Sequence, residues 1–203
     1  MDKKAKEHWD TVYKTKNPEQ VSWTQEVPQP SLDFIRSFNL SKTAKIIDIG
    51  GGDSMLVDYL LEEGFENITV LDISVKAIEK VKMRLGEKAQ KVNWVVSDIT
   101  EFQPDSTFDV WHDRATFHFL VTDEQISRYL DAAGKYVSDY LIIGTFSEKG
   151  PEKCSGLPIR KYDEDEMSLS FSDGFKKISC ITLDHETPFK TKQNFIFCSF
   201  RRI

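Results

Sequence analysis

The stretch Ile46-Ile47-Asp48-Ile49-Gly50-Gly51-Gly52-Asp53-Ser54 decides the fold of this 203-residue chain. It begins as a β-branched run, which is typical of a strand buried on both faces. After three glycines, residues 55–65 place apolar side chains at helical spacing, with Gly64 as a natural stop. A strand, a glycine turn and a helix start form the context in which glycines predict a ligand site, because they let the backbone approach a ligand closely.

Two classes of ligand use such a turn. A dinucleotide site requires G-x-G-x-x-G, but here Met55 stands at the place of the third glycine. Asp48 lies two residues before Gly50, where a carboxylate would repel a pyrophosphate and attract an ammonium group. The pattern therefore favours a cationic nucleoside such as S-adenosylmethionine over a nicotinamide dinucleotide. A tight turn that holds no ligand is the remaining alternative.

Composition excludes several classes of function. The net charge of −6 argues against a nucleic-acid surface, which is usually basic. We find no apolar run near the roughly 18 residues that span a membrane and no apolar signal-peptide core, so we expect a cytoplasmic protein without a membrane partner. The three cysteines are odd in number and lack C-x-x-C spacing, which indicates a reducing compartment and no metal site.

Strand-like and helix-like segments alternate along most of the chain. We expect further strands at residues 68–72, 92–96, 108–112 and 140–146, and helices at 4–13, 31–38 and 74–88 and from residue 122. This alternation predicts a parallel sheet with right-handed crossovers, in which ligands bind at the carboxyl ends of the strands. Four aspartates fall at those ends: Asp48, Asp72, Asp98 and Asp113.

The two ends of the chain differ from this pattern. Residues 175–183 and 193–201 predict two antiparallel strands after a short helix at 162–171. Residues 1–30 form an N-terminal segment that carries Trp9, Tyr13 and Trp23 among polar residues. These rings either pin the segment to the domain or line a ligand pocket beneath a lid.

These residues together resemble the class I, seven-strand S-adenosylmethionine-dependent methyltransferases. Residues 48–52 look like the family's first motif, Asp72 matches the acid that holds the ribose hydroxyls, and Ser97-Asp98-Ile99 matches the segment beside the adenine amino group. The resemblance covers residues 5–200. It implies one α/β domain over residues 1–203, with S-adenosylmethionine as cofactor. The implied sheet is Rossmann-like, doubly wound and mostly parallel, in the order 3-2-1-4-5-7-6 with strand 7 antiparallel. The cofactor-binding residues expected are Asp48, Gly50, Gly51, Gly52, Asp72, Ile73, Asp98, Ile99, His112, Trp9 and Trp23.

Two subgroups of the family are similar to this chain. Bacterial methyltransferases of undefined substrate share His112-Asp113-Arg114-Ala115 and Cys154-Ser155-Gly156-Leu157-Pro158. Elongation-factor lysine methyltransferases carry Asp-Lys-Gly-Thr at the place of residues 113–116. The family's frequent Leu-Lys-Pro-Gly-Gly turn is replaced here by Tyr136-Val137-Ser138-Asp139. The Asn/Asp-Pro-Pro-Tyr motif is missing after the fourth strand, which counts against a nucleobase substrate.

The expected activity is methyl transfer to a small molecule or a protein side chain. A protein lysine is the narrower alternative, and a catalytically silent cofactor-binding module and a nicotinamide oxidoreductase are the others. A base is needed only if the acceptor arrives protonated, and the candidates near the fourth strand are His112, Asp113 and His118. Asp113 could equally form an ion pair with Arg114, and His118 could be a core residue. The oligomeric state stays open.

Overall fold

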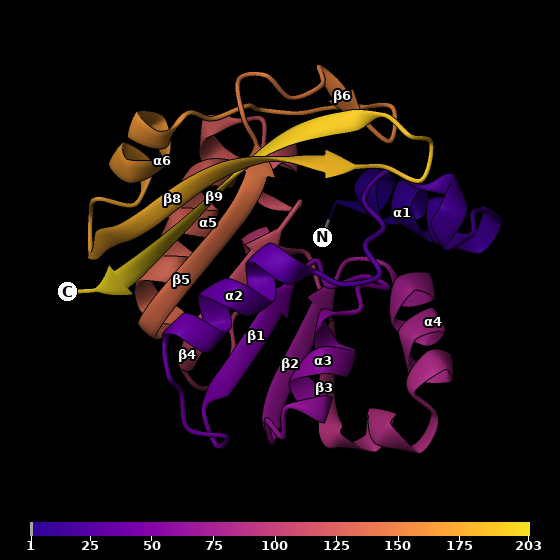
Figure 1. The fold of residues 1–203 in the computed structure, drawn as a ribbon, viewed down its shortest axis with the longest axis horizontal. Helices are drawn as coiled ribbons and strands as arrows, with labels where there is room; N and C mark the ends of the chain where they lie inside the picture. Colours follow the sequence, from indigo (N-terminus) through magenta and orange to yellow (C-terminus); the bar gives the residue numbers. More distant parts are fainter. Residues whose placement is uncertain (1) are drawn as a thin grey trace.

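The centre of the molecule is a seven-stranded sheet in the order β3-β2-β1-β4-β5-β9-β8 (Figure 1). The computed structural model describes residues 2–203. Strands β1 to β5 pair in parallel, and β9 runs antiparallel to both β5 and β8. The predicted fold class, strand order and reversed strand are therefore confirmed. The strands are β1 (Lys45–Ile49), β2 (Asn67–Asp72), β3 (Val92–Val96), β4 (Phe108–Arg114), β5 (Val137–Phe146), β8 (Phe175–Glu186) and β9 (Lys192–Arg202).

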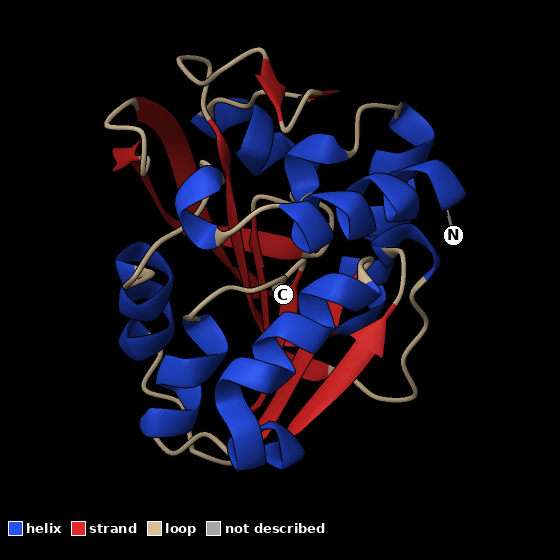
Figure 2. Cartoon of the chain, turned by 90° about the vertical axis from the view of Figure 1, so that its right-hand side faces the viewer, coloured by secondary structure: helices blue, strands red, loops and turns tan. Residues whose placement is uncertain are grey.

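Helices cover both faces of the sheet (Figure 2). On one face lie α2 (Gln29–Ser37), α3 (Leu56–Glu62) and α4 (Val75–Leu85), and on the other lie α5 (Asp123–Tyr136) and α6 (Glu164–Ser170). Strands β1 and β2 are short, β-branched and buried on both faces, as expected where crossover helices cover a parallel sheet. The apolar stripe of each helix completes one of two cores, and the sheet separates these cores.

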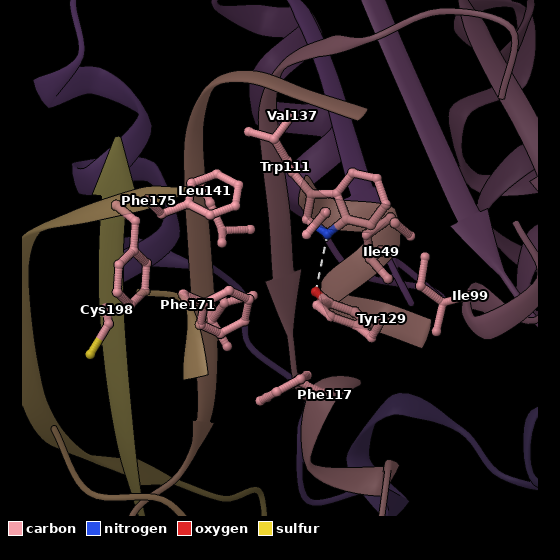
Figure 3. Close-up of a cluster of buried hydrophobic side chains, with 14 of the residues drawn as sticks. Ile49, Ile99, Trp111, Phe117, Tyr129, Val137, Leu141, Phe171, Phe175 and Cys198 are labelled. Carbon is pink, nitrogen blue, oxygen red and sulfur yellow. Dashed lines mark hydrogen bonds between the residues drawn. The ribbon is translucent and has the colours of Figure 1, made fainter. Parts of the chain in front are cut away.

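Large aromatic side chains fill the core between the sheet and α5 (Figure 3). Trp111 of β4 donates a hydrogen bond of 3.0 Å from Nε1 to the hydroxyl of Tyr129, and both side chains are fully buried. Phe117 and Phe171 pack against Tyr129 with ring centroids 4.8 and 6.5 Å away. Because Trp and Tyr need a partner for their polar atoms when buried, this bond fixes how α5 sits on β4.

Alternation along β4 sends neighbouring side chains to opposite faces. Trp111 and Asp113 point toward α5, where Asp113 contacts Tyr129. His112 points to the opposite face and contacts Ser31 of α2. Arg114 follows His112 by two residues and shares its face. This alternation decides which residues of β4 reach the site.

Some element boundaries differ from the predicted ones. Helix α2 begins at Gln29 rather than Ser31, because Pro30 in its first turn already has the backbone torsion of a helix. Ser31 is therefore inside the helix, where it is free to contact His112. The segment between β5 and α6 carries a small hairpin of β6 (Lys153–Cys154) and β7 (Leu157–Pro158). Strand β8 continues to Glu186, three residues past the expected end.

Cys180 and Cys198 form a disulfide between directly paired residues of β8 and β9, with their Cα atoms 4.1 Å apart. The expectation of reduced cysteines therefore fails for this pair. The number and spacing of the cysteines do not reveal that the register of the hairpin places residue 180 opposite residue 198. Cys154 is a free and buried thiol.

Helix α1 (Lys3–Thr15) lies beyond the arrowheads of β1 and β2, near α4 (Figure 1). The carboxylate of Asp10 accepts hydrogen bonds from the Ser74 hydroxyl at 2.7 Å and the Lys76 backbone N–H at 3.2 Å, at the start of α4. Within residues 2–203, no helix has the length and apolar character needed to cross a membrane. The same residues contain no group of three or more His, Cys, Asp or Glu side chains arranged to hold a metal ion.

Candidate functional site

A cavity of about 900 Å³ lies at the carboxyl ends of the parallel strands. Its size is that of a site for a small molecule or cofactor. Helix α1, the following loop, the glycine turn and the β8–β9 turn all contribute to its wall. All but one of the expected cofactor-binding residues line it; Gly52 does not. The lining members are Asp48, Gly50, Gly51, Asp72, Ile73, Asp98, Ile99, His112, Trp9 and Trp23.

The glycine turn needs its glycines for two reasons. Gly50 and Gly52 have φ angles of +63° and +49°, in the left-handed region that other residues rarely adopt. A Cβ atom at Gly50 would clash with the side chain of Thr116, and one at Gly52 would clash with the hydroxyl of Tyr13. Gly52 thus packs against the N-terminal helix, while Gly50 and Gly51 form the cavity floor.

Three polar side chains from three elements form a buried chain beneath the cavity. Nδ1 of His112 lies 2.7 Å from a carboxylate oxygen of Asp48, and Nε2 lies 2.8 Å from the hydroxyl of Ser31. Asp48, His112 and Ser31 are all buried. Both ring nitrogens of His112 are therefore engaged in this arrangement, and the imidazole is placed to orient Asp48.

Asp72 lies at the end of β2 with 5% of its surface exposed, and it accepts a hydrogen bond of 2.7 Å from the Ser74 backbone N–H. Burial raises the pKa of Asp72 to about 7. A hydroxyl donor arriving at this carboxylate would favour its charged form. This is the environment expected of an acid that binds the two hydroxyls of a ribose.

Asp98 follows β3 and is held in a turn of its own. One carboxylate oxygen accepts from the backbone N–H and the hydroxyl of Thr100, at 3.0 and 2.8 Å. The other accepts from the backbone N–H of Asp2 at 3.1 Å. Burial alone would raise the pKa of Asp98, but these hydrogen bonds outweigh burial and lower that pKa overall.

The aromatic residues of the N-terminal segment form one cluster over the cavity. The ring of Trp9 lies 6.2 Å from that of Tyr13, 5.7 Å from that of Trp23 and 5.1 Å from that of Phe119, between centroids. Trp9 and Trp23 also line the cavity. The same ring contacts therefore hold the N-terminal segment to the domain and cover the cavity, so the two alternatives for these rings are compatible.

Asp113 lies away from the cavity. It is fully buried on the α5 side of β4, where it accepts from the Tyr129 hydroxyl at 2.7 Å and from the backbone N–H groups of Thr116 and Phe117 at 3.0 and 3.2 Å. Burial raises the pKa of Asp113 to about 6. These contacts stabilise the turn after β4, and the expected ion pair with Arg114 does not form.

His118 is also removed from the cavity lining. Its ring stacks on Phe146 with centroids 4.5 Å apart, and it is fully buried. Burial, with a smaller effect from Arg114, lowers the pKa of His118 to about 3. Neither ring nitrogen has a hydrogen-bond partner in the described chain. This environment corresponds to the core-residue alternative.

Several residues of the wall opposite the acids were not predicted from the sequence. His185, Phe195, Phe119 and Phe146 line it, together with Arg114 and Cys154. Nε2 of His185 lies 2.7 Å from the carbonyl oxygen of Ser22, so the β8–β9 hairpin closes against the N-terminal segment. Burial and the nearby charge of Arg114 lower the pKa of His185. No local signal in the sequence marks His185 and Phe195, because they reach the cavity only when β9 pairs with β5 and β8 pairs with β9.

Comparisons with known proteins agree with this geometry. Residues 46–139 match the family model described as a methyltransferase domain. The chain is 29% identical over 128 residues to the mouse eEF1A lysine and N-terminal methyltransferase, a match that covers 52% of this chain and 18% of that protein. It is 32% identical over 88 residues to malonyl-[acyl-carrier protein] O-methyltransferase 2 of Ilyobacter polytropus, covering 43% of this chain and 34% of that protein. The match thus spans about a fifth of the length of the first relative and about a third of the length of the second.

Solved structures share the fold along nearly the whole chain. A structure from work on the conversion of a disulfide bond into a thioacetal group during echinomycin biosynthesis has a TM-score of 0.78 at 20% identity, covering 97% of this chain and 92% of that one. The N-methyltransferase NodS of Bradyrhizobium japonicum, in complex with S-adenosylhomocysteine, has a TM-score of 0.71 at 13% identity, with coverage of 96% and 98%. The match over residues 46–139 and the shared fold thus make this chain similar to class I S-adenosylmethionine-dependent methyltransferases.

Proposed function

We propose that this protein transfers the methyl group of S-adenosylmethionine to an acceptor bound in the same cavity. The supporting observation is that one cavity joins two chemically different walls. Asp48, Asp72 and Asp98 lie on the side of β1 to β3, at the positions that the family resemblance gives to the amino acid, ribose and adenine parts of the cofactor. Arg114 and Phe195 lie on the side of β5 and β9.

The residues of the cavity favour catalysis by alignment. Methyl transfer from a sulfonium is an in-line displacement, and the cofactor supplies the reactive group. The protein then has to hold the two reactants in line and exclude water, which the aromatic rings of the N-terminal segment would do. Asp113 and His118 do not line the cavity, and both nitrogens of His112 are engaged. An acceptor that arrives with a free lone pair needs no base.

The acceptor is a small molecule or a protein side chain. The relatives include proteins named for a protein lysine and for a malonyl group on a carrier protein, so they support both classes. A nicotinamide oxidoreductase is disfavoured by Asp48 and by Met55 at the third glycine position. We also propose a cytoplasmic location and, in keeping with the net charge of −6, no nucleic-acid partner.

Calorimetric titration tests cofactor identity. We expect S-adenosylhomocysteine to bind and NADH not to bind. Asp72→Ala should remove charge-assisted hydrogen bonds to the ribose and weaken S-adenosylhomocysteine by about 1.5–3 kcal/mol. Binding of NADH without binding of S-adenosylhomocysteine would contradict the proposal. Cofactor binding without methyl transfer would instead identify a silent cofactor-binding module.

A further inference from the structure

Arg114 is an unusual residue in the cavity wall because one edge of its guanidinium, formed by Nε and Nη2, has no hydrogen-bond partner in the described chain. Nη1 donates a hydrogen bond of 3.0 Å to the carbonyl oxygen of Trp23. Nε and Nη2 are inaccessible to solvent, and in the described chain neither has a hydrogen-bond partner. A buried polar group without a partner carries a cost of desolvation, so this edge favours the arrival of an acceptor oxygen.

No carboxylate within residues 2–203 pairs with this guanidinium. The two other basic residues that line the cavity do have acidic partners: Arg84 lies 2.6 Å from Asp58, and Lys190 lies 3.4 Å from Glu186. Asp48 lies near Arg114, but its carboxylate is hydrogen-bonded to His112. Burial lowers the pKa of Arg114 to about 10, so the group stays positively charged at neutral pH.

The surroundings of Arg114 place it on the acceptor side. Its guanidinium lies over the ring of Phe195 in β9, 5.5 Å from the centroid. The neutral groups nearby are the thiol of Cys154, whose pKa is raised to about 11 by burial, the imidazole of His185 and the hydroxyl of Tyr13. Cys154 and His185 come from the β5–β9 side of the sheet, whereas Asp72 ends β2 and Asp98 follows β3.

We propose that the Nε and Nη2 edge of Arg114 binds a carboxylate of the methyl acceptor. These two N–H groups point in parallel from one edge of the planar guanidinium, and their spacing matches the two oxygens of a carboxylate. The rings of Phe195, Phe119 and Phe146, which line the same cavity, suit an apolar body attached to that carboxylate. The carboxylate orients the acceptor, while the cofactor occupies the side with the acids.

This inference rests on the proposed function, and its test separates the two. The full-length protein, saturated with S-adenosylhomocysteine, is titrated by calorimetry with benzoate and with benzamide, its neutral and nearly isosteric counterpart. We expect benzoate to bind at least about tenfold more tightly, the effect of a charge-assisted bidentate pair. Arg114→Gln should remove that preference. Arg114→Lys should retain part of it, because lysine keeps the charge without the fork.

Three results would overturn the assignment. One is equal binding of benzoate and benzamide, or binding of neither, to the wild-type complex. Another is an unchanged benzoate preference in Arg114→Gln that melts like the wild type. The third is a tenfold loss of S-adenosylhomocysteine affinity in Arg114→Gln and Arg114→Lys with no loss for 5′-methylthioadenosine, which lacks the carboxylate. That result would assign the edge to the cofactor. Failure of the wild type to bind S-adenosylhomocysteine would instead contradict the proposed function itself.

Discussion

The carboxylate of Asp48 and the imidazole of His112 are hydrogen-bonded at 2.7 Å across directly paired residues of β1 and β4. The bond joins the strand that leads into the glycine turn to the strand that leads to Arg114. Ser31 extends the connection to α2 through the second ring nitrogen. A change in any member of this chain should therefore affect cofactor binding through the orientation of Asp48.

Replacement of His112 tests this coupling. His112→Phe keeps the ring volume but removes the donor to Asp48, which leaves a buried carboxylate with one partner fewer. We expect a loss of about 1–3 kcal/mol in unfolding free energy, measured with urea, and a loss of about tenfold in S-adenosylhomocysteine affinity. Ser31→Ala, which touches only the outer bond, should have a smaller effect on both. Unchanged cofactor affinity in His112→Phe would show that Asp48 is oriented by other contacts.

Asp72 should make cofactor binding depend on pH. Its pKa is about 7 in the folded protein because of burial, whereas an exposed aspartate has a pKa of 3.8. Between about pH 4 and pH 7, Asp72 is protonated in the ligand-free folded protein and ionised in the unfolded chain. Its contribution therefore lowers the free energy of unfolding as the pH rises from about 4 to 7. Ribose hydroxyls favour the charged carboxylate, so S-adenosylhomocysteine affinity should increase about tenfold between pH 6 and pH 8. The increase should vanish in Asp72→Asn, and a pH-independent wild type would contradict the assignment.

Asp113 should prove to be a structural residue. Asp113→Ala leaves the Tyr129 hydroxyl and two backbone N–H groups without their acceptor, so unfolding free energy should fall by about 1–3 kcal/mol. Asp113→Asn keeps one acceptor oxygen and should lose less. Cofactor affinity should not change in either variant. A catalytic Asp113 would instead show a fall of 100-fold or more in turnover at unchanged melting temperature, which is the scale of a positioned acid or base.

The N-terminal segment should become more ordered when the cofactor binds. Asp10 joins α1 to the start of α4, and Trp9 and Trp23 line the cavity, so the segment lies over the expected adenosine position. Hydrogen exchange of residues 5–25 should slow on addition of S-adenosylhomocysteine, as for other closing elements. Asp10→Ala should weaken this protection, whereas Asp33→Ala, an exposed change in α2, should not. Equal exchange with and without ligand would count against a lid.

The glycine turn and the acids after β1 to β3 could be predicted from the sequence because each is a local pattern. A strand that ends in an aspartate places that aspartate at the carboxyl edge of a parallel sheet, whichever order the strands take. For Asp113 this reasoning gives the wrong position. It ends a strand as Asp72 does, yet side-chain alternation along β4 sends it to the α5 core and sends Arg114 to the face that lines the cavity.

The part of the cavity wall formed by Phe195 and His185 could not be predicted because it is assembled from distant segments. Phe195 and His185 reach the cavity only because β9 pairs with β5 and β8 pairs with β9. The disulfide between Cys180 and Cys198 depends on the same register. Pairing registers are set by long-range packing, and no single stretch of the sequence carries them.

Detection of the transferred methyl group is the most direct test of the central claim. The protein is incubated with S-adenosylmethionine bearing a trideuterated methyl group and with an extract of its source cells, and the products are analysed by mass spectrometry. We predict a labelled product in the small-molecule or protein fraction with the wild type, less product with Asp72→Ala at a cofactor concentration that does not saturate the variant, and none without protein. Absence of any labelled product above that of the sample without protein, at saturating cofactor, would contradict the account.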